Sequence, residues 1–470
     1  MKSSLNRKHK CILVSALFLI LAAGCLFPVI KNLAKDELQR LDYQQIASSD
    51  YDTVFLSMYP IDTYQEEDYA YFRGMTLFKS AYCIPSLPVL TDYMRQIADS
   101  GNQVTTAYLG IRPELINPEK LQKLLSRYPD ITFEIVLSYP SADYWQTLSQ
   151  EDYEQTLTAY CNFLTAVPDI QEANFYFFGA QEWLISNPGN YLDLWSVNED
   201  IARTLMAYSD REHGSLVTAE NADVFVETLT SLTRSLRTAP QIYPDLSDYC
   251  IIFFGDSVIG NYTDSTSIPG VVSGLTGAEV YNCGYGGNSA ALMPGLLISL
   301  PGIIDAFFRE DLSVLPENTQ VYNGFTSYLE NAPSGKQLCF VINYGLNDYF
   351  SGYPVSSKDP YNIATYSGAV RTAVKLIREN APDARIILCT PNFSSIFENG
   401  TEPHGTDGSV LTDYVNAILS LSQELDTDVL DNYHDLGITP ENEGQYLADQ
   451  VHPNNACRFL IGSNLVRLFQ

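Results

Sequence analysis

Four short segments in the second half of the chain carry the residue types that acyl transfer requires. A serine becomes a nucleophile only when a base takes its proton and a third group orients that base. The reaction also needs hydrogen-bond donors aimed at the oxyanion that develops on the acyl carbon. The segments are Gly255-Asp256-Ser257, Asn282-Cys283-Gly284-Tyr285-Gly286-Gly287, Gly345-Leu346-Asn347-Asp348 and Asp449-Gln450-Val451-His452-Pro453.

The first and last of these segments offer a nucleophile and a base. Ser257 follows an apolar run that ends at Gly255, where a glycine permits a tight turn. Asp449 and His452 are three residues apart and can face each other across one turn. Asp449 could then accept from Nδ1–H and leave Nε2 of His452 to take the serine proton. Ser257 and Asp449 are also good N-cap residues, so either one, taken alone, could simply cap a helix.

The two middle segments offer oxyanion donors. Glycines let backbone amides approach a ligand, so the Gly287 N–H is one candidate and the Ser257 N–H is another. The Asn347 side chain can extend its amide as a third donor. The alternative for both segments is an ordinary turn.

Other histidines compete for the role of base. His213 falls in the first half of the chain and His404 in a polar loop. His434, which lies between Asp431 and Asp435, is the only serious rival to His452.

Taken together, the four segments resemble the sequence blocks of the SGNH/GDSL hydrolase family over roughly residues 249–470. The resemblance implies Ser257 as nucleophile, Asp449 as acid and His452 as base. It also implies Ser257, Gly287 and Asn347 as oxyanion donors, and it calls for no metal or cofactor. Val258 stands where the namesake motif of the family has leucine.

The elements that must hold these residues are strands. Apolar runs at 249–257, 278–285, 336–348, 384–392 and 426–433 alternate with amphipathic helices, most clearly at 361–380 and 409–425. This pattern predicts an α/β fold, a flavodoxin-like three-layer α/β/α sandwich with a parallel five-stranded sheet over residues 249–470. The four segments and Pro391-Asn392 fall at strand ends or helix starts, where such sheets bind ligands.

Residues 49–240 are predicted to form a separate accessory α/β domain. Strand-like runs at 52–60, 102–111, 131–140 and 172–180 alternate with helix-like runs at 87–100, 118–128 and 151–167. Trp145, Trp183 and Trp195 lie here and could stack on sugar rings, although packing in a core is the more ordinary role. Glu182 follows a strand-like run, but no second carboxylate stands out to complete a glycosidase pair.

The residues at the N-terminus predict a membrane anchor. Lys2, Arg7, Lys8 and Lys10 precede an uncharged run over residues 11–30, long enough for a spanning helix. We expect a cytoplasmic tail (1–10), a single transmembrane signal-anchor (11–30), a stalk (31–48) and an extracytoplasmic remainder in the cell membrane. A cleaved signal peptide and lipidation at Cys25 are the alternatives.

Charge and cysteine usage exclude other classes of function. The net charge of −29 argues against nucleic acid as a partner, since phosphates demand basic surfaces. No CxxC pair suggests zinc, and we expect buried free thiols at Cys250, Cys283, Cys339 and Cys389.

The sequence therefore predicts an extracytoplasmic serine esterase that removes small acyl groups, O-acetyl above all, from a cell-wall or surface glycan. A lipid esterase or lysophospholipase and a glycan O-acetyltransferase are the enzymatic alternatives. A non-catalytic glycan-binding protein on a hydrolase scaffold is the alternative of another class.

Overall fold

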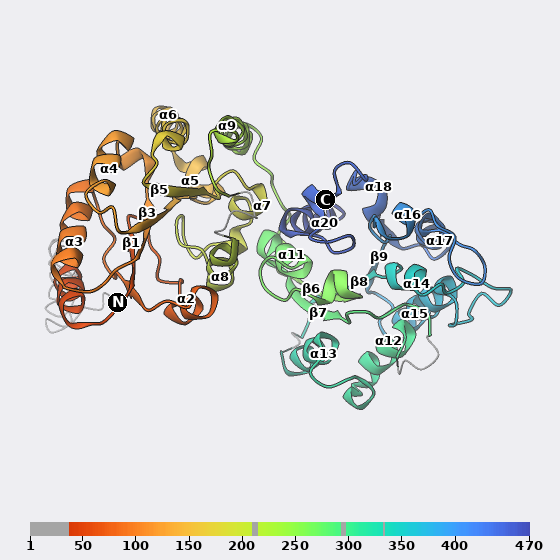
Figure 1. Ribbon diagram of the computed structural model, residues 1–470. Helices are drawn as coiled ribbons and strands as arrows, with labels where there is room; N and C mark the ends of the chain where they lie inside the picture. Colours follow the sequence, from red (N-terminus) through yellow and green to blue (C-terminus); the bar gives the residue numbers. More distant parts are fainter. Residues whose placement is uncertain (1–36, 209–214, 293–297, 332–333) are drawn as a thin grey trace, which may run out of the picture. The chain divides into compact units, whose positions relative to one another are not determined.

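The computed structural model describes residues 37–208, 215–292, 298–331 and 334–470, and the chain divides into two compact units (Figure 1). The first unit contains the described residues up to 139 together with 148–179 and 202–230. The second contains 140–147, 180–201 and 231–470. Each unit is built on its own sheet.

The first unit has a five-stranded parallel sheet in the order β2-β1-β3-β4-β5. Its strands are β1 (Thr53–Ser57), β2 (Leu77–Lys79), β3 (Thr106–Ile111), β4 (Thr132–Leu137) and β5 (Ala173–Phe177). Every residue of β1 and β3 is buried, as expected for a sheet covered on both faces. The sequence predicts four of these strands. It misses β2, whose three residues are too few to show a hydrophobic period.

Helices lie between and after these strands, and two of them begin at capping side chains. The longest ones are α2 (Glu66–Arg73), α3 (Leu87–Asp99), α4 (Pro118–Leu125), α6 (Gln150–Ala166), α8 (Glu199–Tyr208) and α9 (Ala222–Thr238). The Asn117 side chain accepts the Lys120 N–H at the start of α4, and Ser149 accepts the Asp152 N–H at the start of α6. These caps satisfy backbone donors that a helix leaves unpaired in its first turn.

Residues 37–48, within the segment predicted as a stalk, form a helix that packs on the first unit. Asp42 on this helix is 2% exposed. Its carboxylate accepts the backbone N–H groups of Ala81 and Tyr82, and the Tyr93 hydroxyl at 2.8 Å. This part of the segment is therefore bound to the domain and does not extend away from it.

The second unit contains the predicted five-stranded parallel sheet, in the order β10-β9-β8-β6-β7. The strands are β6 (Tyr249–Gly255), β7 (Glu279–Gly284), β8 (Gln337–Asn343), β9 (Arg385–Cys389) and β10 (Asp428–Leu430). In chain order this is 2-1-3-4-5, the flavodoxin-like arrangement. The order reverses between β6 and β8, and such sheets bind ligands in the crevice at that point, beyond the carboxyl ends of the strands.

Helices cover both faces of this sheet. α11 (Ile268–Thr276) packs against α20 (Asn455–Arg467), while α15 (Tyr366–Asn380) packs against α12 (Leu300–Arg309) and α17 (Leu411–Glu424) (Figure 1). α13 (Gln320–Asn331) lies beside the edge strand β7. Cys250, Cys283, Cys339 and Cys389 are buried free thiols in this unit, as predicted.

The second unit also takes in three segments from the predicted accessory domain, 140–147, 180–201 and 231–240. The first two carry α5 (Ala142–Thr147) and α7 (Glu182–Ile185). The Asn198 side chain donates to Ser265 Oγ at 3.1 Å, and a side chain on Gly274 of α11 would meet Asn187 and Gly189. Trp145 and Trp183 are buried here, so two of the three tryptophans are packing residues. Glu182 is exposed at the start of α7.

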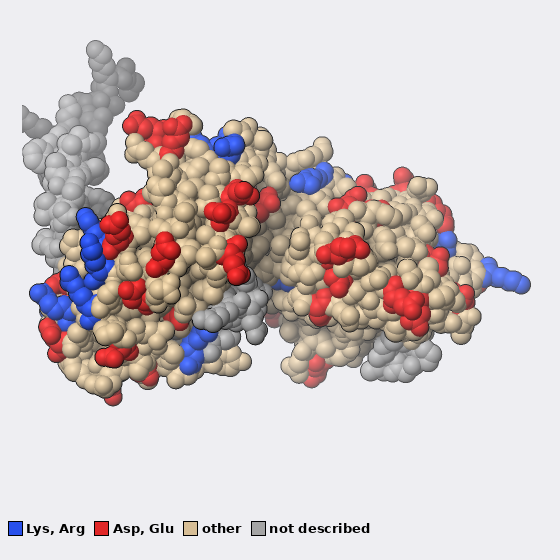
Figure 2. Space-filling view, turned by 45° about the horizontal axis from the view of Figure 1, so that its top comes forward, with Lys and Arg blue, Asp and Glu red and all other residues tan. Residues whose placement is uncertain are grey.

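Within the residues described, no helix combines the length and apolarity needed to cross a bilayer, and the predicted span over 11–30 lies outside them. Figure 2 shows acidic side chains spread over the visible face. Basic side chains gather on the flank where α3 and α4 lie in Figure 1.

Candidate active site

Ser257 stands at a sharp turn between β6 and the short helix α10 (Ser257–Gly260). Asp256 caps this helix, its Oδ1 accepting the Val258 N–H at 2.9 Å. Gly255 lies so close to its surroundings that a Cβ there would stand 2.5 Å from Ile259 Cγ1 and 2.9 Å from the Asn343 carbonyl oxygen. Only glycine fits this approach, and the turn carries Ser257 to the carboxyl edge of the sheet.

Asp449 and His452 lie on a tight loop that ends where α20 begins. An antiparallel bridge between Leu447 and Pro453 closes the loop, and the Ala448 N–H donates to the His452 carbonyl at 2.8 Å. Asp449 Oδ1 accepts the backbone N–H groups of Val451 and His452, both at 2.7 Å. Asp449 Oδ2 lies 2.7 Å from His452 Nδ1. The carboxylate is therefore fixed behind the imidazole.

The other ring nitrogen of His452 reaches Ser257. His452 Nε2 lies 2.9 Å from Ser257 Oγ, although the two residues are 195 positions apart in the chain. With Nδ1–H donating to Asp449, Nε2 is free to accept the serine proton. The structure thus brings together Ser257, His452 and Asp449 in the geometry of a nucleophile, a base and an orienting acid.

The end of β9 holds this loop in place. The Asn392 side chain donates to the Val451 carbonyl at 3.1 Å, and Ser394 Oγ donates to the Gln450 carbonyl at 2.9 Å. Both side chains are fully buried. Asn392 was expected at this edge from its position after a strand. Ser394 carries no sequence signal, because a hydrogen bond to a distant backbone leaves no local pattern.

The Asp449 carboxyl has a lowered pKa. Partial burial acts to raise this pKa, but hydrogen bonds from the His452 ring and from the backbone of His452 and Val451 outweigh it. Asp449 is consequently ionised at neutral pH and can stabilise a positive charge on His452.

Three groups are available as oxyanion donors around Ser257. The N–H groups of Ser257 and Gly287 have no acceptor within the described part of the chain. Gly287 has φ +77°, a conformation that favours glycine, and open space lies on its side-chain position. A Cβ on the adjacent Gly286 would be 3.8 Å from Ser257 Cβ, so this loop lies against the serine. Asn347 Nδ2 donates to the Asn288 carbonyl at 2.9 Å, which uses one of its two amide protons.

Asn282 ties the glycine loop to the helix that carries Ser257. Its Nδ2 donates to the carbonyls of Ile259 and Tyr262 at 2.9 and 3.0 Å, and its Oδ1 accepts the Gly284 N–H at 3.0 Å. Asn282 is thus a positioning residue.

Two buried carboxyls support the site. Asp348 accepts the N–H groups of Ala290 and Ala291, both at 2.9 Å, and so fixes the segment that follows Gly287. Burial raises the pKa of Asp348 to about 6. Burial also raises the pKa of Asp256 to about 7, with a further contribution from the Asp348 charge. The sequence does not reveal either role.

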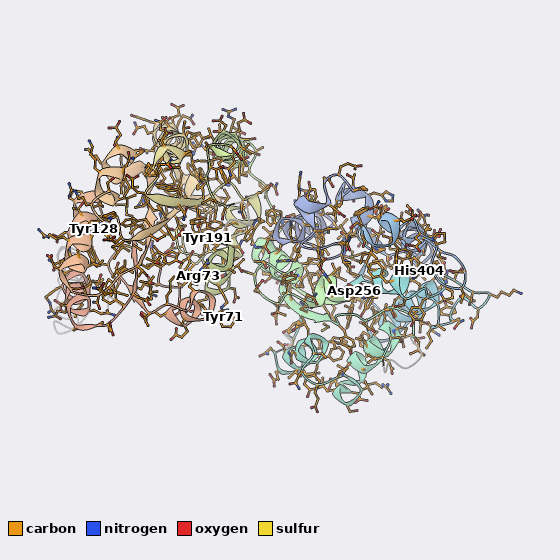
Figure 3. All side chains as sticks on the ribbon, in the orientation of Figure 1. Tyr71, Arg73, Tyr128, Tyr191, Asp256 and His404 are labelled. Carbon is orange, nitrogen blue, oxygen red and sulfur yellow. The ribbon has the colours of Figure 1, made fainter. Side chains whose placement is uncertain are left out.

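The competing histidines do not contact Ser257. His434 Nδ1 lies 2.8 Å from Asp431 Oδ2, but its side chain is 56% exposed and no hydroxyl completes the pair among the described residues. His404 stacks on Phe397 at 4.2 Å between ring centroids and lies beside Tyr349 (Figure 3). His213 lies outside the described residues. The described residues also hold no cluster of three or more His, Cys, Asp or Glu side chains suited to a metal ion.

Comparison with known proteins identifies the domain that carries this geometry. Residues 253–457 match the family described as GDSL-like Lipase/Acylhydrolase. The match covers less than half of the chain, and it identifies the protein as a serine ester hydrolase. No curated protein sequence matches the chain.

Solved structures resemble about half of the chain. A protein from Lactobacillus plantarum is 17% identical with a TM-score of 0.36, over 49% of this chain and 97% of its own. A protein described as a possible lipase, from Chitinophaga pinensis DSM 2588, is 19% identical with a TM-score of 0.31, over 47% and 97%. A GDSL-like lipase from Bacteroides thetaiotaomicron VPI-5482 is 14% identical with a TM-score of 0.31, over 49% and 94%.

Proposed function

We propose that this ester hydrolase, whose GDSL-like domain spans residues 253–457, uses Ser257 as nucleophile, His452 as general base and Asp449 to orient the imidazole. The observation that carries the proposal is the 2.9 Å hydrogen bond between His452 Nε2 and Ser257 Oγ, with the Asp449 carboxylate 2.7 Å behind Nδ1.

In the first half of the reaction, His452 takes the hydroxyl proton as Ser257 Oγ attacks the ester carbonyl. The N–H groups of Ser257 and Gly287 and the Asn347 amide hold the oxyanion of the tetrahedral intermediate. His452 then donates the proton to the departing alcohol, which leaves an acyl-enzyme on Ser257. In the second half, His452 deprotonates a water molecule, which attacks the acyl-enzyme and releases the carboxylic acid and the free serine.

The proposed substrate is a small acyl ester, O-acetyl above all, on a cell-wall or surface glycan. This substrate is proposed from the expected location of the enzyme. The basic residues before position 11 and the uncharged run over residues 11–30 favour a single-pass anchor in the cell membrane. The hydrolase domain then lies outside the cytoplasm, where such glycans are the first esters that it meets.

The acyl preference is tested with p-nitrophenyl acetate, butyrate and octanoate, using the full-length protein beside Ser257→Ala. We expect the rate to fall as the acyl chain lengthens. A rate that rises toward octanoate would favour a lipid esterase and overturn the glycan proposal. Acetate release from an O-acetylated polysaccharide, with the chemically deacetylated polymer as control, then tests the glycan directly.

The anchor is tested by protease treatment of intact cells. Before protease treatment, the hydrolase domain is expected to be found in the membrane fraction. Protease added to intact cells is then expected to digest it. A domain that resists protease until the cells are lysed would contradict the proposed orientation.

A further inference from the structure

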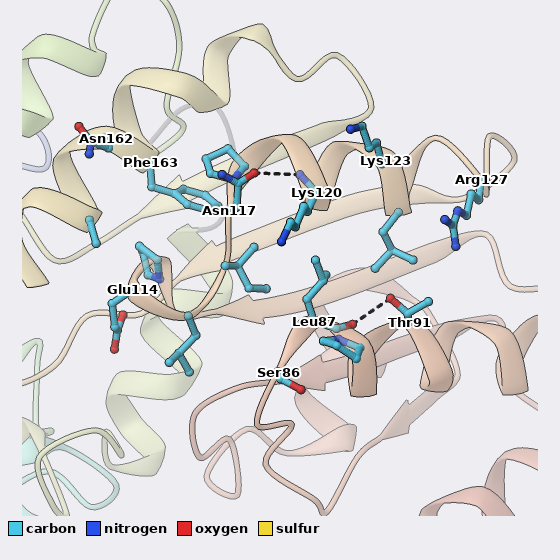
Figure 4. A pocket seen from close by; sticks show the side chains of 17 residues that line it. Ser86, Leu87, Thr91, Glu114, Asn117, Lys120, Lys123, Arg127, Asn162 and Phe163 are labelled. Carbon is cyan, nitrogen blue, oxygen red and sulfur yellow. Dashed lines mark hydrogen bonds between the residues drawn. The ribbon is translucent and has the colours of Figure 1, made fainter.

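The first unit contains a groove whose lining is cationic, in a chain whose net charge is −29. The groove has a volume of about 810 Å³ and is lined by the start of α3, the residues that lead into α4, α4 itself and part of α6 (Figure 4). Lys120, Lys123 and Arg127 are its basic residues. Figure 2 shows basic side chains gathered on this flank of the molecule.

These three cations are available to a ligand. Each is exposed, and none forms an ion pair with a carboxylate in the part of the chain that the structure describes. Figure 4 shows the Lys120 side chain extending from α4, and the Arg127 side chain from the turn after α4, toward the α3 side of the groove, whereas the Lys123 amino group lies on the other side of α4. The single acidic residue of the lining, Glu114, is already paired with Arg112 at 2.5 Å. The local charge of the groove is therefore positive.

Two helix N-termini add to this potential. α3 and α4 both begin at the groove, at Ser86-Leu87 and Asn117-Pro118. The N-terminus of a helix carries a partial positive charge and favours anions. The Ser86 side chain caps no N–H of the first turn of α3 and is free to bind a ligand.

The spacing of the cations fits a ligand with several charges. Lys120 and Lys123 lie three residues apart on α4, and Arg127 lies in the turn that follows the last residue of α4, Leu125, so the cations are distributed along this edge of the groove. A single phosphate cannot contact all three, whereas a linear polymer with repeated charges can.

The four uncharged polar residues of the lining favour a sugar or polyol polymer over nucleic acid. Ser86, Thr91, Asn117 and Asn162 offer hydroxyl and amide groups that can bind hydroxyls. The single aromatic ring of the lining, Phe163, is 1% exposed, so the groove offers no platform for stacking bases.

We propose that this groove binds a linear anionic glycan or polyol polymer, with Lys120, Lys123 and Arg127 contacting its repeated charges. The negative charge of the rest of the chain does not prevent this, because salt screens distant charges beyond about 8 Å at physiological ionic strength. The inference concerns the first unit and does not depend on the proposed reaction, since binding is measured without turnover.

The test measures binding of the full-length protein by isothermal titration calorimetry at physiological ionic strength, about 0.15 M. The probes are polygalacturonate, whose charges are carboxylates, and poly(glycerol phosphate), whose charges are phosphodiesters. Neutral dextran and single-stranded oligothymidylate are the comparison polymers. We expect one or both anionic polymers to bind, and the tighter of the two identifies the charged group.

The triple variant Lys120→Gln/Lys123→Gln/Arg127→Gln is expected to weaken this binding by about tenfold or more. The charge-preserving variant Lys120→Arg/Lys123→Arg/Arg127→Lys is expected to retain it. Lys358→Gln, which removes an exposed lysine of the second unit, is the matched control and should bind as the wild type does. Unchanged binding by the triple variant would overturn the proposal. So would equal binding of dextran, tighter binding of oligothymidylate, or no binding of either anionic polymer.

Discussion

At the scale of single residues, Asp449 serves both the loop and the imidazole. Its Oδ1 accepts two backbone N–H groups of the residues that follow it, and its Oδ2 accepts His452 Nδ1–H. The backbone bonds hold the carboxylate behind the imidazole, so a spacing of three residues is enough to orient the ring. Asp431 and His434 repeat this spacing, but no serine of the described residues hydrogen-bonds to the His434 ring.

Asp449→Asn is expected to lower kcat for p-nitrophenyl acetate by about 10²–10⁴. The amide removes the negative charge that stabilises the imidazolium, and it can turn a donor toward Nδ1–H. Asp431→Asn is the matched control, because it alters the same kind of Asp-His pair elsewhere in the domain. Its kcat should stay within about twofold of the wild type. Equal losses in the two variants would mean that Asp449 acts only through stability.

At the scale of elements, the buried carboxyl of Asp348 joins the end of β8 to the loop that follows β7. Asp348→Asn is expected to destabilise the protein by about 1–3 kcal/mol in urea unfolding, because one N–H of Ala290 or Ala291 then faces a donor. Asp407 accepts two backbone N–H groups in the same way but is exposed, so Asp407→Asn should cost about 0.5 kcal/mol or less. Equal effects would contradict the role of burial.

Asp256 caps α10 from a buried position, and burial raises its pKa to about 7. Between about pH 4 and pH 7 the folded protein therefore keeps a proton that the unfolded chain has lost. The stability that this group contributes is fully present below about pH 4 and is lost as the pH rises through about 7. Asp256→Asn cannot titrate. The free energy of unfolding of the wild type should therefore fall relative to that of Asp256→Asn as the pH rises from 5 to 8. Urea titrations at each pH measure this difference.

Asp311 is a matched control for this pH effect, because it caps a helix from an exposed position. Its hydrogen bonds from Ser313 lower its pKa, so it is ionised throughout this range. The difference between Asp311→Asn and the wild type should not change from pH 5 to pH 8. Parallel profiles for Asp256→Asn and the wild type would refute the assignment of the proton to Asp256.

The sequence predicts the elements of the second unit better than the contacts that hold the site. Strand ends of a parallel sheet meet at one edge, so the proximity of Ser257, Gly287 and Asn347 follows from the order of strands and helices. Asp348, Asn282 and Ser394 act by hydrogen bonds to backbone groups that are distant in sequence. Such bonds depend on the folded path of the chain, and no local pattern predicts them.

At the scale of the whole molecule, the two sheets share one strand order, but the four segments that carry the candidate catalytic residues lie in the second unit. The sequence predicts two domains, yet not that segments 140–147 and 180–201 belong with the hydrolase. Their attachment depends on the close approach of Gly189 to Gly274 and on side-chain amides such as Asn198. Small and polar residues of this kind give no periodic signal along the chain.

Labelling with a fluorophosphonate tests most directly whether Ser257 is the nucleophile that His452 activates. The reagent phosphonylates an activated serine, and mass spectrometry of the digested full-length protein locates the adduct. We expect one adduct, on Ser257, and a labelling rate that falls by at least about 10² in His452→Ala. An adduct on another residue, or an unchanged rate in His452→Ala, would contradict the proposed chemistry.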